Sequence, residues 1–532
     1  MVHNPPTQIE IQTISCPTAT VGISAMAGPD HDRSRVRTPA SRPRGENRTF
    51  SGQNDSVVDI RESWRLNCVT LRQKRSLHMD ALSTFAPASI DATSDISFLP
   101  PALRGPLRER VARATRDARA RDHYSRAVRQ WAPVADQRYR CCTQLPSLGA
   151  NEIPVIRVGI KDTVDIAGWP TRFGLPHFRR YPETTAPIVR HLPEDTLVAK
   201  LTTTQLSVGR ASGCVNPYFP GLDPAGSSTG SAVAVAANIC DVALGTDVLG
   251  SVRFPAGCCG VTGLRMTHQP RLTEGLLTIS SLLDAPGWIT RTPADLAYLW
   301  EALDLQGLLP SGNEQPPREG VIGVVAEVAG EDCDDDVFAA LTAAQAEVAA
   351  AGLGLKPVEL STVWHVRADA WRLCAFDTYR LGRRWRDLVD SEFDDATRAA
   401  FDLLDDVTDE EYDSTVTALQ RVRSVIADLF AAQGVDAWLL PLGQRLPVAL
   451  GAIPAGTPTI LNPRDSRFGD RLGFTSLASA AGLPAICFPI GVHPHRHTPV
   501  PVQLVGPPGS EAHLIELAVR IGGPGALDLL PR

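Results

Sequence analysis

Short runs of β-branched residues alternate with Ala-rich segments through the middle of the chain. Three such runs predict strands at 155–160, 241–244 and 321–325, because each is short and holds β-branched side chains. Between the first two, the segment from Ser231 to Ala237 predicts a helix. Strands and helices that alternate along a chain are typical of an α/β sandwich, and this is the fold class that the pattern predicts.

The last third of the chain predicts longer helices and two further strands. Asp334, Asp335 and Asp336 are expected to begin a helix that ends at Gly352. Acidic side chains stabilise the positive end of a helix, so we interpret this run as a cap and not as a metal site. The remaining predicted elements are a mostly helical stretch at 361–435, strands at 437–440 and 502–505, and a closing helix marked by Leu514, Leu517, Ala518 and Ile521.

Nine arginines and only three acidic residues lie between Arg104 and Arg129. A basic cluster of this kind is one signal of nucleic-acid binding. Here the arginines are spaced through Leu107, Val111, Ala114 and Ala118, as on the solvated face of an amphipathic helix. Because the whole chain carries a formal charge of −7, we predict a surface helix and no nucleic-acid partner.

Composition excludes several classes of protein. The chain is 43% hydrophobic and 21% charged, as in globular proteins. Its best apolar stretch, from Ser231 to Gly250, is interrupted by Asn238, Asp241 and Asp247, which excludes a membrane span. Eleven cysteines, with vicinal pairs at 141/142 and 258/259, suit neither a disulfide framework nor a C-x-x-C metal site, so a cytoplasmic location is expected.

The first 78 residues differ from the rest of the chain. They are rich in Ser, Thr, Pro and Arg, with eleven basic and seven acidic side chains and no sustained hydrophobic period. We interpret residues 1–78 as a disordered extension.

Two segments combine small, hydroxyl and glycine residues. The first is Pro224-Ala225-Gly226-Ser227-Ser228-Thr229-Gly230-Ser231, and the second runs from Gly245 to Pro255. Ser and Thr before a helix often serve only as caps. Capping does not explain the second segment, where glycines flank Ser251 and backbone amides can turn toward one point, as an oxyanion hole requires.

Together with Gly159-Ile160-Lys161-Asp162 upstream, these segments resemble the amidase signature family. The family's two loop serines lie twenty-four residues apart, and Ser227 and Ser251 keep that spacing. The resemblance extends over roughly residues 95–525 and implies an α/β/α sandwich with a large mixed sheet. It further implies a single amidase domain at 79–532, in which 304–434 is a mostly helical variable region that lines the substrate pocket.

Carried over to this chain, the resemblance implies a Ser-cisSer-Lys triad for hydrolysis of a small carboxylic amide. Ser251 would be the nucleophile, Ser227 the bridging serine and Lys161 the base. A lysine accepts a proton only when neutral, so its pKa must fall from about 10.4 to near 7 through burial. The implied oxyanion hole consists of the amides of Val248, Leu249, Gly250 and Ser251, with Gly226, Thr246, Asp247 and Arg253 in support. No metal or organic cofactor is implied.

Some features leave alternatives open. Leu249 stands where the family usually has glycine, which restricts the backbone of that turn and keeps a non-catalytic binding module as an alternative. Gly226-Ser227-Ser228-Thr229-Gly230 also fits G-x-S-x-G with Ser228 as nucleophile, but a loop and not a strand precedes it. That mechanism would need one of His493, His495 and His497, which we assign to a hairpin turn. The same signature occurs in amidotransferase subunits, although nothing here indicates their partner. The sequence does not determine the oligomeric state, for which a homodimer is one option.

Overall fold

The computed structural model describes residues 99–145, 153–310 and 320–522. The chain divides into two units, Met1–Arg75 and Ser76–Arg532, and every described residue belongs to the second. The predicted extension at 1–78, and with it the predicted boundary at 79, lies outside the described residues.

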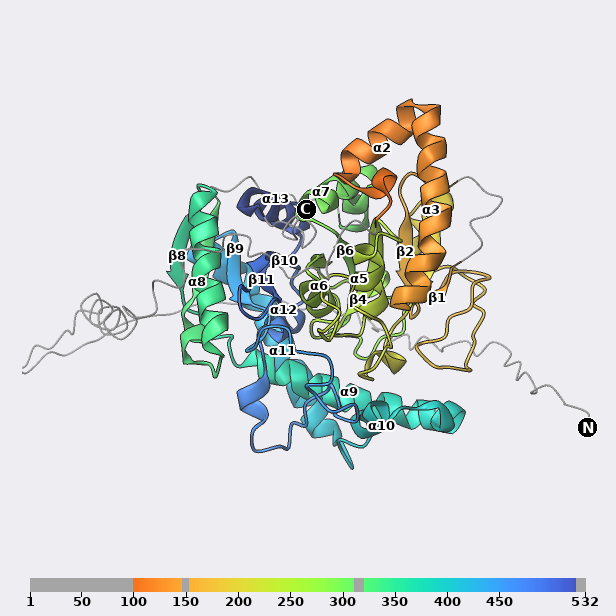
Figure 1. Ribbon diagram of the computed structural model, residues 1–532. Coiled ribbons are helices and arrows are strands. Elements are labelled where there is room, and N and C mark those ends of the chain that lie inside the picture. Colours follow the sequence, from red (N-terminus) through yellow and green to blue (C-terminus); the bar gives the residue numbers. More distant parts are fainter. Residues whose placement is uncertain (1–98, 146–152, 311–319, 523–532) are drawn as a thin grey trace, which may run out of the picture. The chain divides into compact units, whose positions relative to one another are not determined.

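A mixed sheet of 11 strands organises the described part of the chain, in the order β1-β3-β2-β4-β6-β5-β10-β11-β9-β7-β8 (Figure 1). Strand β2 pairs in parallel with β3 and β4, and β7 pairs in parallel with β8 and β9. Between these two groups, the neighbouring strands β4, β6, β5, β10, β11 and β9 pair antiparallel. The strands are β1 (Cys142–Gln144), β2 (Val158–Lys161), β3 (Leu197–Leu201), β4 (Val242–Asp247), β5 (Thr262–Arg265), β6 (Ala285–Thr290), β7 (Val321–Val325), β8 (Gly354–Val358), β9 (Ala437–Pro441), β10 (Ala485–Val492) and β11 (Pro499–Val505).

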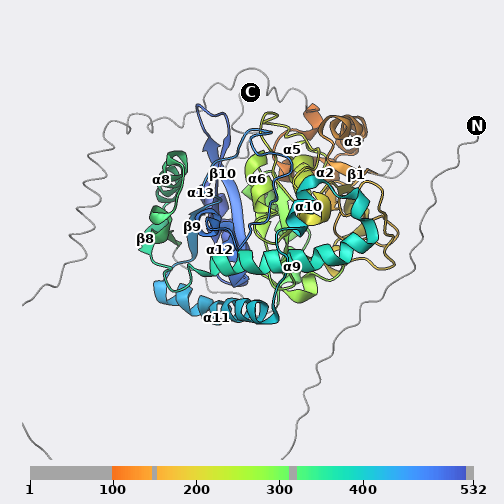
Figure 2. The ribbon, with the colours of Figure 1, turned by 90° about the horizontal axis from the view of Figure 1, so that it is seen from below.

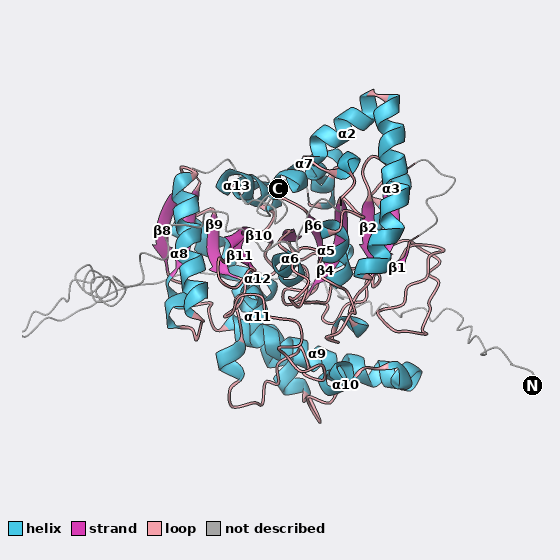
Figure 3. Ribbon diagram, viewed as in Figure 1, coloured by secondary structure: helices cyan, strands magenta, loops and turns pink. Residues whose placement is uncertain are grey.

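Helices lie on both faces of this sheet (Figure 3). They are α2 (Leu107–Arg116), α3 (Ala118–Tyr139), α4 (Pro187–Arg190), α5 (Thr229–Ala236), α6 (Arg253–Cys259), α7 (Pro293–Ala302), α8 (Asp335–Ala350), α9 (Val366–Val389), α10 (Asp395–Phe401), α11 (Asp409–Gln433), α12 (Thr475–Ala481) and α13 (Glu511–Ile521). Figures 1 and 2 show α9 and α11 packed side by side.

The alternation of side chains along a strand separates two hydrophobic clusters. In β4, Ala243 packs with α3, α5 and α6, whereas Val242 and Leu244 belong to the cluster that contains α7, α9, α12 and α13. The chain therefore forms a helix–sheet–helix sandwich, which confirms the predicted α/β class.

Most predicted elements are present. The strands at 241–244, 321–325, 437–440 and 502–505 correspond to β4, β7, β9 and β11, and the acidic run at 334–336 begins α8. The run at 155–160 forms a strand only from Val158. Within the range 304–434, which was predicted to be a mostly helical variable region, the described residues form the helices α8 to α11, the predicted strand β7 and the unpredicted strand β8.

The arginine-rich segment departs from the prediction of one surface helix. The helix breaks at Asp117, whose side chain accepts a hydrogen bond from the Arg119 amide and caps α3. Arg110 is buried and pairs with Asp241 at 2.5 Å, beside the buried Arg157 on the same carboxylate. This charge cluster attaches α2 to the sheet.

Among the described helices, none combines the length and apolar character that crossing a bilayer requires.

Candidate active site

Lys161 is the last residue of β2, and its side chain is fully buried. Its amine donates hydrogen bonds to the hydroxyls of Ser227 and Thr246, each with an Nζ–Oγ distance of 2.7 Å. The parallel pairing of β2 with β4, in which Ile160 lies opposite Leu244, brings the carboxyl ends of both strands to one edge. Ser227 reaches this edge from the loop before α5 and follows a cis peptide bond after Gly226.

The surroundings of Lys161 favour the neutral amine. Burial lowers its pKa to about 7, while the charges of Asp284 and Asp247 act in the opposite direction. Asp284 is itself buried, which raises its pKa to about 6, and it accepts the amides of Ile279 and Ser280 at 2.9 Å each. A lysine that is half neutral near pH 7 is able to accept a proton from an alcohol.

A second buried lysine provides a contrast. Lys200 of β3 lies 3.3 Å from the Asp162 carboxylate and donates to the carbonyl of Val164 at 2.5 Å. Burial lowers its pKa as well, but here the main opposing influence is the directly contacting carboxylate of Asp162. Lys161 contacts two hydroxyls instead of a carboxylate, so its environment is the one suited to a base.

Ser251 lies in the turn after β4 and is partly buried. Its carbonyl accepts a hydrogen bond from the Ser228 amide at 3.1 Å, which joins the two serine-containing segments. Within the described residues, no hydrogen bond connects the Ser251 hydroxyl to that of Ser227. The structure therefore brings Lys161 and Ser227 into contact and places Ser251 on the adjoining backbone.

The turn that carries Ser251 is built around the carboxylate of Asp247. This carboxylate accepts the amides of Gly250 at 2.8 Å and Val252 at 3.2 Å. Gly250 was predicted as an oxyanion donor, but its N–H is directed at Asp247 and is not available. The amides of Val248, Leu249 and Ser251 form no hydrogen bond within the described part of the chain.

Leu249 does not strain this turn. Gly250, not Leu249, takes the positive φ of +123°, and a Cβ there would lie 2.6 Å from a ring carbon of Phe254. Leu249 is absent from the non-glycine residues with positive φ among those described. The residue that departs from the family pattern therefore occupies a position where a side chain is tolerated.

Two buried arginines neutralise Asp247. Arg253 donates to both carboxylate oxygens, at 3.0 and 2.8 Å, and Arg265 approaches at 3.2 Å. Burial alone would raise the pKa of Asp247, but these arginines outweigh that effect and hold the pKa below its usual range. Arg253 also donates to the Thr475 carbonyl at 3.0 Å and to the Gln503 side chain at 2.9 Å. The turn is thereby attached to α12 and β11.

Ser228 does not fit the alternative nucleophile. Its side chain is fully buried, and its hydroxyl exchanges hydrogen bonds with the backbone of Thr246 at 3.2 Å. His493 begins the turn between β10 and β11, as predicted, and its ring lies 3.4 Å from Asp336. A G-x-S-x-G mechanism therefore lacks an accessible hydroxyl, and no histidine among the described residues forms a hydrogen bond with Ser228.

Comparison with known proteins identifies the family. The family model described as Amidase matches residues 125–515. The chain belongs to the amidase signature family. This confirms the resemblance drawn from the motifs.

Relatives within the amidase signature family carry several names. The chain is 32% identical over 320 residues to 2-amino-5-chloromuconic acid deaminase of Comamonas testosteroni, covering 58% of this chain and 66% of that protein. It is 30% identical to a glutamyl-tRNA(Gln) amidotransferase subunit of Halorhodospira halophila, covering 73% of this chain and 86% of the other. The match covers 66% of the Comamonas testosteroni deaminase, and it covers 31% and 40% of two other curated relatives.

Solved structures of amidase-like proteins share the fold. The structure of 6-aminohexanoate cyclic dimer hydrolase complexed with substrate superposes with a TM-score of 0.67 at 21% identity, and covers 80% of this chain and 98% of the other. At this identity the match establishes the fold alone.

Some contacts of this amidase-family site could not be predicted from the sequence, among them those of Arg265, Gln503 and Asp284. Each is a polar residue within or beside an apolar strand, and each is buried. A lone polar side chain in a buried strand indicates a buried partner, because unpaired burial is costly. That signal was present in the sequence but did not identify the partners.

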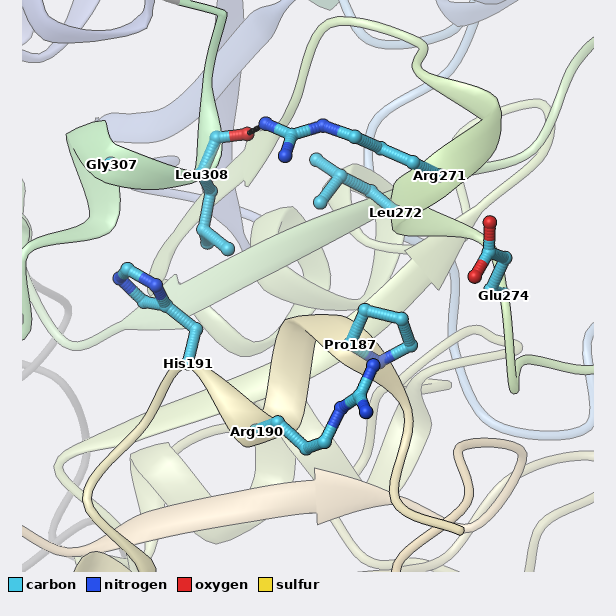
Figure 4. Close-up of a pocket in the computed structure, with 8 residues that line it drawn as sticks. All are labelled: Pro187, Arg190, His191, Arg271, Leu272, Glu274, Gly307 and Leu308. Carbon is cyan, nitrogen blue, oxygen red and sulfur yellow. Dashed lines mark hydrogen bonds between the residues drawn. The ribbon is translucent and has the colours of Figure 1, made fainter.

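A pocket of about 390 Å³ lies elsewhere in this family member, between α4 and the turn at Pro270–Leu272 (Figure 4). Arg271 donates a hydrogen bond to the Leu308 carbonyl on one side of it, and Arg190 and His191 lie on another. None of the predicted site residues lines this pocket, so it is separate from the candidate active site.

Proposed function

We propose that this chain is an amidase that hydrolyses a carboxylic amide through an acyl-enzyme on Ser251. The observation that carries the proposal is the 2.7 Å contact between the buried Lys161 amine and the Ser227 hydroxyl. A lysine with a pKa of about 7 at this position supplies a base without histidine. Membership of the amidase signature family supports a carboxylic amide as the substrate.

The proposed reaction moves one proton through two serines. Ser227 gives its proton to the neutral Lys161 amine and takes the proton of Ser251, whose oxygen attacks the amide carbon. Because no hydrogen bond joins the two hydroxyls, the relay requires one of the serine side chains to rotate. The proton then returns to the leaving amine, an acyl ester remains on Ser251, and water releases the acid by the same route.

The negative oxygen of the tetrahedral intermediate requires donors. The amides of Val248, Leu249 and Ser251 are the candidates, because no hydrogen bond engages them within the described residues. The amide of Gly250 instead helps Asp247 hold the turn. Each donor of this kind accounts for about 3 to 4 kcal/mol of transition-state stabilisation.

Hydrolysis of a panel of amides and esters tests the function. Ser251→Ala is expected to abolish turnover, and Lys161→Ala to reduce it by orders of magnitude while the protein still folds. Lys356→Ala is the matched control, because Lys356 is an exposed lysine of β8. Normal turnover by Lys161→Ala on any amide that the wild type cleaves would contradict the mechanism.

A non-catalytic binding module is the second candidate. The absence of a hydrogen bond between the Ser227 and Ser251 hydroxyls, both among the described residues, is the observation that favours it. Treatment with a fluorophosphonate, followed by peptide mass spectrometry, separates the two functions. Phosphonylation of Ser251 supports the hydrolase, and an unmodified Ser251 supports the binding module.

A further inference from the structure

A second group of reactive side chains lies where α3 meets β1, among residues to which the proposed hydrolysis gives no role. One ligand atom each from Asp136, Cys141 and Cys142 lies within 4.8 Å of the other two. Cys141 is buried, and Asp136 and Cys142 are half-buried, so part of the cluster is accessible to solvent. Both cysteines are free thiols.

The backbone holds these side chains together. Arg140 adopts a left-handed conformation with φ of 53° and donates its amide to the Asp136 carbonyl at 2.7 Å, which ends α3 and turns the chain back. The Cys142 amide then donates to one oxygen of the Asp136 carboxylate at 2.8 Å. A carboxylate fixed through one oxygen presents the other to a ligand. The end of α3 therefore brings the backbone of Cys141 and Cys142 to the Asp136 carboxylate.

The donor set selects a class of metal ion. Two thiols and one carboxylate match the ligands of zinc, which binds sulfur and oxygen tetrahedrally. Magnesium and calcium prefer oxygen ligands alone. We propose that Asp136, Cys141 and Cys142 bind one Zn²⁺ ion, with water as the fourth ligand. The sequence alone did not indicate this site, because its third ligand lies on the preceding helix and no C-x-x-C motif is present.

The location connects this site to the loop of Ser227. The Cys141 carbonyl accepts the Thr202 amide at 2.9 Å, and the Thr202 carbonyl accepts the amide of Gly230 at 2.8 Å. Zinc would tie β1 to the end of α3 and thereby restrain this chain of hydrogen bonds. Zinc is therefore expected to raise the melting temperature of the wild type and not that of a variant without the ligands.

Metal titration of the full chain tests the proposal. The protein is stripped with a chelator, kept reduced, and titrated with Zn²⁺ in competition with a chromophoric chelator. A parallel titration with Co²⁺ records the near-ultraviolet absorption that arises only when thiolate binds cobalt. Cys142→Ser and Asp136→Asn are compared with Cys333→Ser, in which the lost thiol is half-buried but lies outside the cluster.

The wild type is expected to bind one equivalent of Zn²⁺ and to develop the thiolate–cobalt band. Affinity should fall at least about 100-fold in Cys142→Ser and at least about tenfold in Asp136→Asn, and remain unchanged in Cys333→Ser. If Cys142→Ser does not fold, Asp136→Asn decides, because it retains both thiols. Two results would overturn the proposal. One is a wild type without the cobalt band, and the other is a wild type with the same Zn²⁺ affinity as Asp136→Asn. Either would show that the three residues do not bind a metal ion together.

Discussion

The pH dependence of covalent labelling at Ser251 tests the environment of Lys161 without knowledge of the substrate. An ordinary lysine is neutral in only about one molecule in 3,000 at pH 7, whereas a pKa of about 7 makes half of the amines neutral. This lowering of the Lys161 pKa corresponds to about 5 kcal/mol in favour of the neutral amine. Protonation removes the base, so labelling should be lost as the pH falls through about 7.

The assay measures the second-order rate of fluorophosphonate labelling between about pH 5.5 and 9.5. The neutral fraction of Lys161 predicts a rise of about tenfold from pH 6 to pH 8 and then a plateau. Asp284→Asn removes a negative charge that raises the pKa of Lys161, so its profile should shift to lower pH. Lys161→Met should label slowly and without this inflection.

Two results would refute the reasoning. A rate that rises about tenfold for every pH unit up to pH 9.5 would show a lysine with an ordinary pKa. A shift of the Asp284→Asn profile to higher pH would show that Asp284 does not act on Lys161 through its charge. The first outcome would remove Lys161 as the base of the proposed reaction, and the second would remove the influence assigned to Asp284.

Three further substitutions test the turn and its neighbours. Gly250→Ala should lower stability by about 1 to 3 kcal/mol in thermal unfolding, because its Cβ would meet Phe254 at a positive φ; an unchanged melting temperature would contradict the turn geometry. Asp247→Asn should lower the free energy of unfolding at pH 7 by about 3 to 5 kcal/mol, since it leaves two buried arginines without their counter-charge; a loss below about 1 kcal/mol would show that the network is dispensable. Ser228→Ala should still be labelled at Ser251, and loss of labelling with the fold retained would return Ser228 to consideration as nucleophile.

Elements with a buried, periodic pattern were predictable from the sequence. The helix α8 has an acidic start, an apolar face and a glycine end, and β9 is apolar throughout. Strand β8 was missed because four of its five residues are exposed, and Lys356 and Pro357 interrupt any apolar run. Only its parallel pairing with β7 in the folded sheet identifies it as a strand.

The site was predictable as a set of residues but not as a geometry. The spacing of Ser227 and Ser251 and the position of Lys161 could be taken from motifs. The direction of the Gly250 amide could not, because it depends on where the Asp247 carboxylate lies within a single turn. The same holds for Arg110, whose partner Asp241 lies 131 residues away.

The anchoring of Arg253 bears on how the protein matures. Its guanidinium is fixed by the Thr475 carbonyl and the Gln503 side chain, which lie 222 and 250 residues further along the chain. During synthesis, the segment around Ser251 leaves the ribosomal exit tunnel long before Thr475 or Gln503 does. The nascent polypeptide should therefore remain inert toward substrate until β11 has left the exit tunnel.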